Sequence, residues 1–587
     1  MKDNLAFQNE LLNLAEQGFT LIVESRKLAH QLQWRYRQRL PESGRAGWDQ
    51  PAVVTLNDWA KRFWEDLWPE TWPAPAFSRW RMLSEIIEDL PPPQPLDLQI
   101  PLVLQVDETV EHCLRYGLDP GGGGAAGQLV EWRRTLWKPY HALLSQSGMF
   151  HPASLPEMLF QRLLAFPSLI PEKLVFVGFE FAGYWEKALL KLMGEHPMVK
   201  HFPLPLGVSD HEALVCANPE QELYALLEDL TISAEKTPLH ALAVVLLAPD
   251  SYTPSLTKLL SDLFGMPLVG NHAAYNLSPN RFLVHQPLFQ AALLPIAFAV
   301  KDQPRTLLLS LLRSPYYRYL GGLSRLTMQW DWIWRTNNLD AGLRGLMDAL
   351  GETEKEMLPK KGQELLEGLG AFLEKDHQTG CGWVKALQDF WGRMEFPVLA
   401  NECDEVGWQA LQETLSQFGE AFGRVPLSLR DCMGWLVAAA EKTNVQERGF
   451  EDAGIQIIGG LDARGLAFER VYIPGLIAGT LPQPVQPFPF LSREERNKVQ
   501  GGTVESQYAF GRLLFNQFSM MTRALILSRP LNDAQGEKCL PSPFWSGRHE
   551  RMVEPTVPWR HTLPALQRAR WVGDGLAGIS MGFKTAL

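Results

Sequence analysis

An arginine in a glycine-bearing turn between two apolar runs is the most informative chemical feature of this sequence. The run 455–458 precedes the turn, Arg464 and Gly465 lie within it, and the run 471–473 follows it. This order predicts a buried strand, a turn and a second buried strand. Arginine is always charged and its planar fork suits phosphate oxygens. The chemistry that such a turn could support is therefore contact with an anion.

Two further strand-to-helix turns carry polar residues that could meet the same kind of ligand. A predicted strand at 20–23 leads into a helix that begins near Arg26 and Lys27, and a strand at 52–56 leads into a second helix after Thr55. Helix N-termini present free backbone amides, so both turns could contact a phosphate. Judged alone, each is better explained as an ordinary turn with a capping residue. The region from Ser25 to Leu40 has five Arg or Lys residues and no acid, and charge alone favours a solvated helix face for it.

Composition limits the classes of protein that fit. The chain has 587 residues, of which 46% are hydrophobic and 21% are charged, so we expect a globular protein of roughly three to five domains. A net charge of −11 argues against a generally basic surface but allows a local basic groove. The six cysteines are scattered without metal-ligand spacing, which predicts a reduced, cytoplasmic protein with no metal or cofactor of its own. The sequence has no signal-peptide pattern and no apolar run that could span a membrane.

The elements that must position these residues alternate between strand and helix. Near-continuous apolar strands at 174–177 and 241–247 are typical of a parallel sheet that is covered on both faces. Mainly helical stretches at 77–167 and 304–442 interrupt this alternation. We therefore expect an α/β fold with two doubly wound parallel-sheet domains, each carrying a helical insertion.

The order of these motifs resembles that of UvrD-like superfamily 1 helicases. The turn at 460–476 is similar to their motif V, which touches DNA and nucleotide, although Ala467 stands where the motif has a glutamate. The turns at 20–29 and 54–59 resemble motifs Ia and Ib, which hold DNA phosphates. The Arg313-Ser314-Pro315 segment is similar to the entry into the second insertion. The resemblance implies two RecA-like domains in a 1A-1B-2A-2B layout.

The residues that hydrolyse ATP in that family do not occur at the matching positions. The chain contains no GxxxxGK[ST] loop, and Gly178 and Phe179 follow the strand that carries the metal-binding Asp-Glu pair in active relatives. Glu180 comes one step late and is expected to be a surface or loop-capping acid. The arginine-finger position falls near Met520, with Arg512 too early and Arg523 too late. These departures predict a helicase-like chain without a working ATPase site.

One branch of the family fits best. The stretch from Pro487 to Glu494 resembles the AddB-like "probable DNA repair proteins" of bacteria, relatives of the RecB and AddB helicase-nuclease subunits, and the resemblance covers about residues 18–530. Such proteins usually continue into a PD-(D/E)XK nuclease, whereas the region from Pro530 to Leu587 has no Asp followed by an ExK. The resemblance implies a scaffold subunit that binds single-stranded or end-containing DNA beside an AddA-like motor. The alternatives are an active ATP-dependent helicase or exonuclease subunit and a partner-holding protein that binds no DNA.

The predicted DNA contacts and domains follow from this resemblance. The contacts are Arg26, Lys27, Thr55, Arg313 and Arg464. The domains are 1A at 1–76 and 168–205, insertion 1B at 77–167, domain 2A at 206–303 and 443–530, insertion 2B at 304–442, and a C-terminal extension at 531–587.

Overall fold

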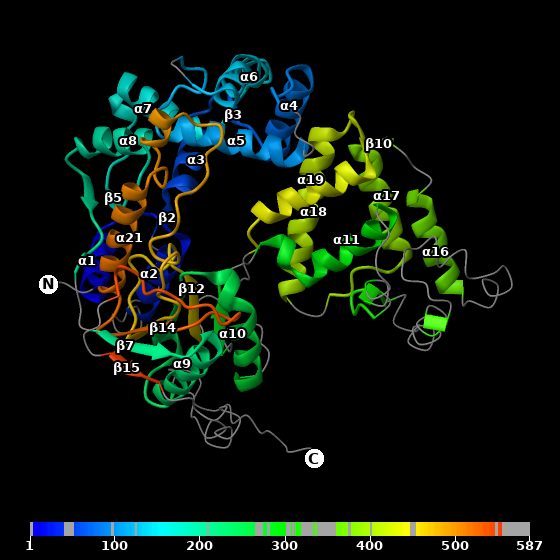
Figure 1. The fold of residues 1–587 in the computed structure, drawn as a ribbon. Helices are drawn as coiled ribbons and strands as arrows, with labels where there is room; N and C mark the ends of the chain where they lie inside the picture. Colours follow the sequence, from blue (N-terminus) through cyan, green and yellow to red (C-terminus); the bar gives the residue numbers. More distant parts are fainter. Residues whose placement is uncertain are drawn as a thin grey trace.

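The computed structural model of the chain combines two parallel β-sheets with a body of helices (Figure 1). It describes residues 4–39, 52–94, 99–123, 126–207, 211–264, 274–278, 282–300, 307, 310–311, 313–318, 332, 335–336, 360–373, 377–399, 402–445, 454–545 and 550–553. Among the helices of this part of the chain, none is long and apolar enough to cross a membrane.

The first sheet has four parallel strands in the order β2-β1-β5-β6. Alternate residues of β1 and β5 point to opposite faces, and helices cover both of them. On one face Leu21 and Val175 pack with α1 and α2, and on the other Ile22 and Phe176 pack with α3, α7 and α8. The bounds are β1 Thr20–Val23, β2 Val53–Thr55, β5 Leu174–Val177, β6 Val199–Phe202, α1 Asn4–Glu16, α2 Arg26–Arg39, α3 Leu56–Asp66, α7 Leu155–Ala165 and α8 Tyr184–Gly194.

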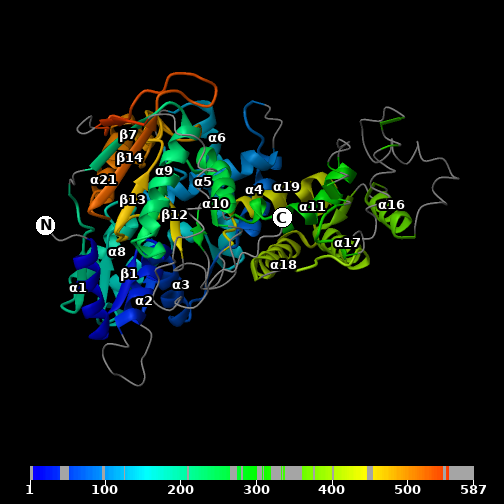
Figure 2. The same ribbon diagram turned by 90° about the horizontal axis from the view of Figure 1, so that it is seen from below.

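The second sheet has seven parallel strands in the order β15-β7-β14-β13-β8-β12-β9. Its central strands are buried on both faces, with α9 and α10 on one side and α21 on the other, as Figure 2 shows from below. The bounds are β7 His211–Cys216, β8 Leu242–Leu246, β9 Tyr275–Leu277, β12 Ile455–Gly459, β13 Arg470–Ile473, β14 Ala524–Pro530, β15 Glu550–Met552, α9 Pro219–Ala234, α10 Pro249–Phe264 and α21 Val504–Phe518.

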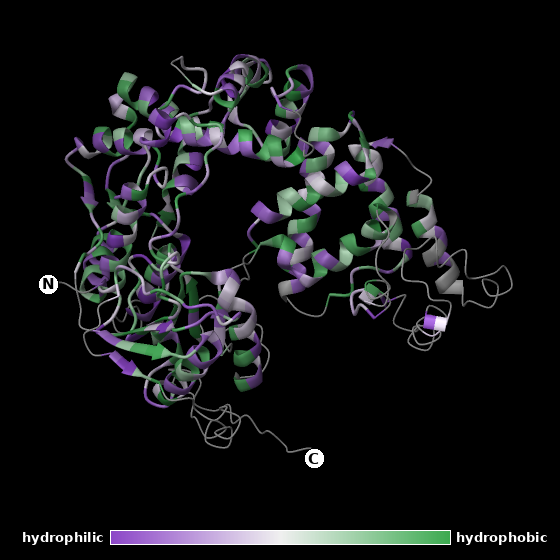
Figure 3. Ribbon diagram, in the orientation of Figure 1, coloured by the Kyte–Doolittle hydropathy of each residue, from purple (hydrophilic) through white to green (hydrophobic). Residues whose placement is uncertain are grey.

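Helices from both predicted insertions share one hydrophobic core and form a single helical body, which occupies the top and right of Figure 1. Trp80 stacks on Trp435 with ring centroids 5.9 Å apart, and Phe77 meets Phe418 and Phe422 edge to face. In Figure 3 these helices alternate green and purple along their length, as amphipathic helices do. They are α4 Ala76–Asp89, α5 Gln99–Arg115, α6 Gln128–Gln146, α11 Pro287–Val300, α16 Lys360–Leu373, α17 Gly380–Arg393, α18 Glu402–Phe422 and α19 Leu429–Lys442.

Short elements complete the described structure. Two small sheets pair β3 with β4 in parallel and β10 with β11 antiparallel, and a one-turn helix, α20, precedes α21. Their bounds are β3 Trp72–Pro73, β4 Met149–Phe150, β10 His377–Thr379, β11 Pro426–Ser428, α20 Arg493–Arg496, and the 3-10 turns η2 Pro152–Ser154, η3 Pro167–Leu169, η4 Leu239–Ala241 and η5 Leu283–His285.

The two α/β units are joined by one continuous apolar core. Residues from α1, α2 and β5 belong to the same cluster as residues from β12, β13, β14 and α21. The loop between β12 and β13 lies against α1 and α2. Gln8 donates to the carbonyl of Gly465 at 2.8 Å, and Gln31 both donates to and accepts from the backbone of Ala467 at 3.0 Å.

The predicted α/β class with parallel sheets is confirmed. The strands predicted at 20–23 and 174–177 lie at those residues, and the others shift by one or two positions. Four strands of the two large sheets, β6, β7, β9 and β15, and all four strands of the two small sheets were not predicted. Strand β15 pairs with β7 from within the predicted C-terminal extension, and α11 packs in the helical body although it falls inside the predicted domain 2A. The domain boundaries themselves remain predictions.

A substitution at Gly465 measures how tightly the β12–β13 loop packs against its neighbours. Its φ is +75°, and a β-carbon built there would lie 2.9 Å from Leu204 and 3.0 Å from Leu28. We expect Gly465→Ala to lower the free energy of unfolding by about 2–4 kcal/mol, because it adds backbone strain and overpacks the interface. Thermal and urea unfolding measure this.

The matched control is Gly479→Ala. Gly479 has a φ of +91° with no atom near a built β-carbon, so only the strain applies there. Equal losses in the two variants would contradict tight seating of the loop.

Candidate nucleic-acid interface

A cleft of about 770 Å³ lies where both α/β units meet the helical body. Its walls include the β1–α2 turn, the β2–α3 turn, α5 with η2, and the β12–β13 loop. Four of the five residues predicted to contact DNA line it: Arg26, Lys27, Thr55 and Arg464. The fold thus brings together residues that are up to 438 positions apart in the chain (464 − 26).

Arg26 and Lys27 open α2 at the cleft. The Arg26 side chain is about half exposed, and its guanidinium lies 3.4 Å from the carboxylate of Asp58. An ion pair this exposed adds little stability, so the guanidinium can exchange partners. Lys27 is half-buried. Two later arginines of this helix contact α1 instead, where Arg35 donates to Gln8 at 2.9 Å and Arg39 donates to Asn9 at 2.6 Å.

Thr55 is the N-cap of α3. Its hydroxyl oxygen accepts from the amide of Asp58 at 3.2 Å and its hydroxyl donates to the Asp58 carboxylate at 2.8 Å. This is the ordinary capping arrangement that stabilises a helix start. Thr55 therefore has a structural role in the turn, and its contact with DNA stays a prediction.

Arg464 reaches from the second α/β unit to two carboxylates of the first. One guanidinium nitrogen, Nη2, lies 2.6 Å from Glu24 and 3.0 Å from Glu180, and Nε donates to Gln517 at 2.8 Å. The guanidinium also lies over the ring of Phe181, 5.0 Å from its centroid. Arg464 is 9% exposed, so in this structure it joins the two units rather than facing solvent.

We call Glu24, Glu180, Arg464 and Gln517 the interdomain ion cluster. Its two acids follow the carboxyl ends of two adjacent parallel strands. Glu24 comes directly after β1, and Glu180 comes three residues after β5. Glu180 also accepts from the amide of Leu204 at 2.7 Å. Its predicted role as a loop-capping acid is consistent with that bond, and the structure adds the pairing with Arg464.

Glu24 has an altered acidity because of this position. Burial raises the pKa of Glu24 to about 7, and repulsion from Glu180 adds to the effect, while the attraction of Arg464 opposes it. Near neutral pH the carboxyl group therefore exchanges between its charged and neutral forms.

Other arginines of the cleft also have acidic partners. Arg79 forms a bidentate pair with the buried Asp107, at 3.0 and 2.9 Å, and Arg115 lies 3.6 Å from Glu186. Burial by itself would raise the pKa of Asp107, but Arg79 and His151 outweigh it and hold that pKa well below its usual range. The lining residues comprise the bases Arg26, Lys27, Arg79, Arg115 and Arg464 and the acids Glu24, Asp58, Glu111, Glu186 and Asp462. The cleft is thus balanced in charge, not uniformly basic.

Aromatic rings form part of the same wall. Phe181 and Phe510 meet edge to face with centroids 4.5 Å apart, and Trp185 lies beside Phe160 and Tyr184. Phe181, Phe510 and Trp185 all line the cleft and remain partly exposed. Such rings can stack on nucleobases without reading their sequence.

The remaining predicted DNA contact, Arg313, and the residues near the arginine-finger position do not line the cleft. Arg313 is exposed on the helical body and is not among the residues that line the cleft. Arg512 and Arg523 are exposed and also do not line it, and Met520 is buried. Within the described residues, no group of three or more His, Cys, Asp or Glu side chains could hold a metal ion.

Sequence reasoning missed several residues of this site. Glu24 carried a usable signal, since a lone acid directly after a buried parallel strand often lies at a functional edge. Asp107 and His151 lie in or beside helices with no motif around them, and only the folded chain brings them to Arg79. No protein-family model and no curated protein matches this chain.

The raised pKa of Glu24 predicts a pH effect on stability. The carboxyl group binds its proton more tightly in the folded state (pKa about 7) than in the unfolded state (about 4.3). The free energy of unfolding should therefore fall as pH rises between these two values and level off above them. Glu24→Gln should lack this component, so its stability relative to the wild type should increase from pH 5 to pH 8 in thermal unfolding experiments.

The matched control is Asp66→Asn, at an exposed position at the end of α3. A pH-independent difference between Glu24→Gln and the wild type would contradict the assigned acidity.

Proposed function

We propose that this chain is a DNA-binding, helicase-like scaffold subunit of a recombinational DNA-repair helicase-nuclease, and that it does not hydrolyse ATP. The observation that carries the proposal is the convergence of the β1–α2, β2–α3 and β12–β13 turns on one cleft. Each turn was linked to DNA binding by its resemblance to a helicase motif, not by its residues alone. The first two turns follow neighbouring parallel strands, so the fold alone brings them together. The β12–β13 loop comes from the second sheet, and its arrival at the same place is what supports a shared ligand.

The shape and lining of the cleft suit a short stretch of single-stranded DNA. A volume of about 770 Å³ is within the range that ligand sites occupy. Arg26 and Lys27 at a helix start can meet backbone phosphates, while Trp185, Phe181 and Phe510 offer faces for bases. Because the acids balance the bases, binding would depend on stacking as well as on charge.

The 1A-1B-2A-2B layout belongs to the same proposal. Two parallel-sheet units, helical segments inserted in each, and a cleft between them agree with that arrangement. In it, the interdomain ion cluster would lie where motor relatives bring magnesium acids and arginines together around a nucleotide. Here Arg464 already pairs with both acids. This supports a unit that grips DNA while an AddA-like partner supplies the motor and a nuclease domain elsewhere makes the cuts.

A second candidate is a partner-holding scaffold that binds no DNA. The observation that favours it is the pairing of the cleft arginines: Arg26 with Asp58, Arg79 with Asp107, Arg115 with Glu186 and Arg464 with Glu24. A cleft with few uncommitted charges attracts a polyanion less strongly than an open basic groove.

Charge reversal at the start of α2 distinguishes the two candidates. We expect Arg26→Glu with Lys27→Glu to weaken binding of a single-stranded 30-mer at least tenfold, because two phosphate contacts become repulsive. Fluorescence anisotropy across a salt series should also show a shallower slope of log binding constant against log salt concentration. Each phosphate contact on a single strand contributes about 0.7 to that slope, so the loss of two contacts should reduce it by about 1.4.

Lys61→Glu with Arg62→Glu is the control, since it reverses two neighbouring charges at exposed positions of α3 that do not line the cleft. It should leave affinity within about twofold if the site is the cleft. Unchanged affinity and slope in Arg26→Glu with Lys27→Glu would favour the partner-holding scaffold instead.

A further inference from the structure

A second connection between the α/β units and the helical body lies outside the DNA contacts. Residues 474–503, which run from β13 to α21 and which we call the strap, leave the second sheet, contact α5 and α6, and return. Phe488, Leu491 and Val499 of the strap share a small apolar core with Cys113 and Leu118 of the helical body. Phe490 is 2% exposed and packs beside Trp132, with ring centroids 5.8 Å apart.

A fully buried arginine lies at the centre of this contact. The Arg133 side chain has no exposed surface, and it donates to Glu495 at 2.8 Å and to the carbonyl of Phe490 at 3.3 Å, both on the strap. It also donates to the carbonyl of Pro120 within the helical body. A buried guanidinium needs such partners, and losing its carboxylate would leave an uncompensated charge.

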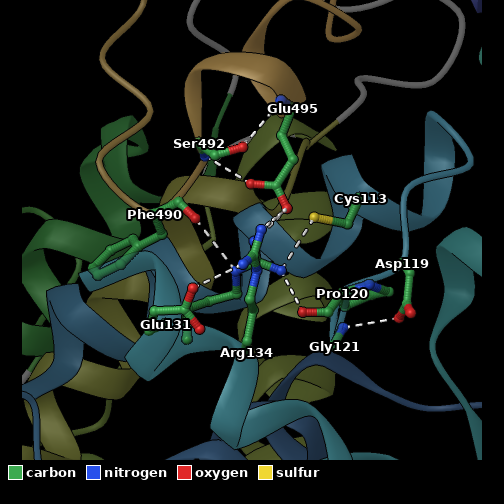
Figure 4. Close-up of polar contacts among 10 residues, drawn as sticks. Cys113, Asp119, Pro120, Gly121, Glu131, Arg134, Phe490, Ser492 and Glu495 are labelled. Atoms are coloured by element: carbon green, nitrogen blue, oxygen red, sulfur yellow. Dashed lines mark hydrogen bonds and ion pairs between the residues drawn. The ribbon is translucent and has the colours of Figure 1, made fainter. Parts of the chain in front are cut away.

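Glu495 is itself held in place for this pairing. The amide of Ser492 donates to its second carboxylate oxygen at 2.7 Å, and the Ser492 hydroxyl accepts from the amide of Glu495 at 3.2 Å, which forms a capping box at the start of α20. Arg134 approaches the same carboxylate at 3.6 Å. Figure 4 shows Ser492 and Glu495 of the strap above Cys113, Pro120 and Arg134 of the helical body.

The Cys113 thiol beside this pair remains neutral and does not compete with Glu495 for Arg133. Cys113 lies 3.7 Å from Arg133, and burial raises the pKa of Cys113 to about 11, although the arginine pulls it down. A neutral thiol leaves Glu495 as the carboxylate that balances the guanidinium.

The strap also reaches the cleft. Gln500 near its end lines the cleft together with Glu111 and Arg115, which lie in the last turns of α5. Cys113 lies two residues from each of them, on the opposite side of α5, so the strap packs against α5 behind its cleft-facing side.

We infer that the strap is a clasp between the second α/β unit and the helical body, that the Arg133–Glu495 ion pair closes it, and that its release frees the α5 wall of the cleft. The clasp consists of one ion pair, a small apolar cluster and the ring of Phe490, whereas each unit keeps its own larger core without them. This inference does not depend on what the cleft binds.

Hydrogen-exchange mass spectrometry of the whole chain tests the clasp. Glu495→Gln keeps the shape of the side chain and removes the charge that balances Arg133. We expect amide exchange in the strap and in residues 111–118 to become at least about tenfold faster, with less than about a twofold change in β1 and β5. Phe488→Ala, which removes an apolar anchor and no charge, should accelerate exchange in the same two segments.

Glu494→Gln is the control, because Glu494 is exposed on the same short helix and carries the same charge. It should leave exchange unchanged everywhere. Exchange that stays at wild-type rates in Glu495→Gln would overturn the clasp. So would a uniform acceleration across all elements, because that would mean a general loss of stability.

Discussion

The arrangement of this molecule depends on one charged contact across the boundary between its two α/β units. Arg464 is 9% exposed, and two carboxylates from the first unit converge on one of its nitrogens. Taking an arginine out of water is costly unless its donors are satisfied, and removing one partner from a buried pair typically costs about 3–5 kcal/mol. The relative position of the two sheets must therefore keep Glu24 and Glu180 within reach. Gln517, which is 1% exposed, fills the remaining side of the guanidinium.

Further contacts join the two units beside this ion cluster. In the loop that carries Arg464, the backbone carbonyls of Gly465 and Ala467 accept hydrogen bonds from glutamines of α1 and α2. One apolar core extends beneath this loop from one sheet to the other. A nucleotide-driven motor needs two domains that move against each other as ligand binds and leaves. A frame joined by an ion cluster, hydrogen bonds and a shared core is better suited to holding a strand at a fixed distance. The helical body forms the third side of that frame, and the strap joins it to the second α/β unit.

The sequence predicted those parts of the fold whose signal is local. Strands such as 174–177 are continuous apolar runs, and the helix starts after 20–23 and 52–56 follow them directly, so these elements were found within a residue or two. The strand β6 reads Val-Lys-His-Phe and β15 reads Glu-Arg-Met, with exposed side chains at the sheet edges, and neither has a pattern that separates it from a loop.

The residues of the candidate site also fall into those that a local pattern identifies and those that only tertiary packing brings in. Arg26, Lys27, Thr55 and Arg464 could be chosen because each lies on a turn with a recognisable order of residues. Their partners could not, since Glu180 and Arg464 are 284 positions apart and the Arg133–Glu495 pair spans 362. Contacts of that separation are set by tertiary packing, which no local pattern records. The charge balance of the cleft follows from those partners, which the run of bases in α2, assigned to a solvated helix face on charge alone, did not indicate.

The central claim is that this frame binds without nucleotide chemistry, because Arg464 satisfies the acids that would otherwise face a metal–nucleotide complex. Isothermal titration calorimetry of the whole chain with magnesium-ATP, run with the wild type at neutral pH, tests this most directly. The account predicts no saturable heat at nucleotide concentrations up to about the millimolar range in which typical nucleotide-using enzymes bind their substrates. A saturable isotherm with one site per chain would contradict it and would return the chain to the class of ATP-dependent motors.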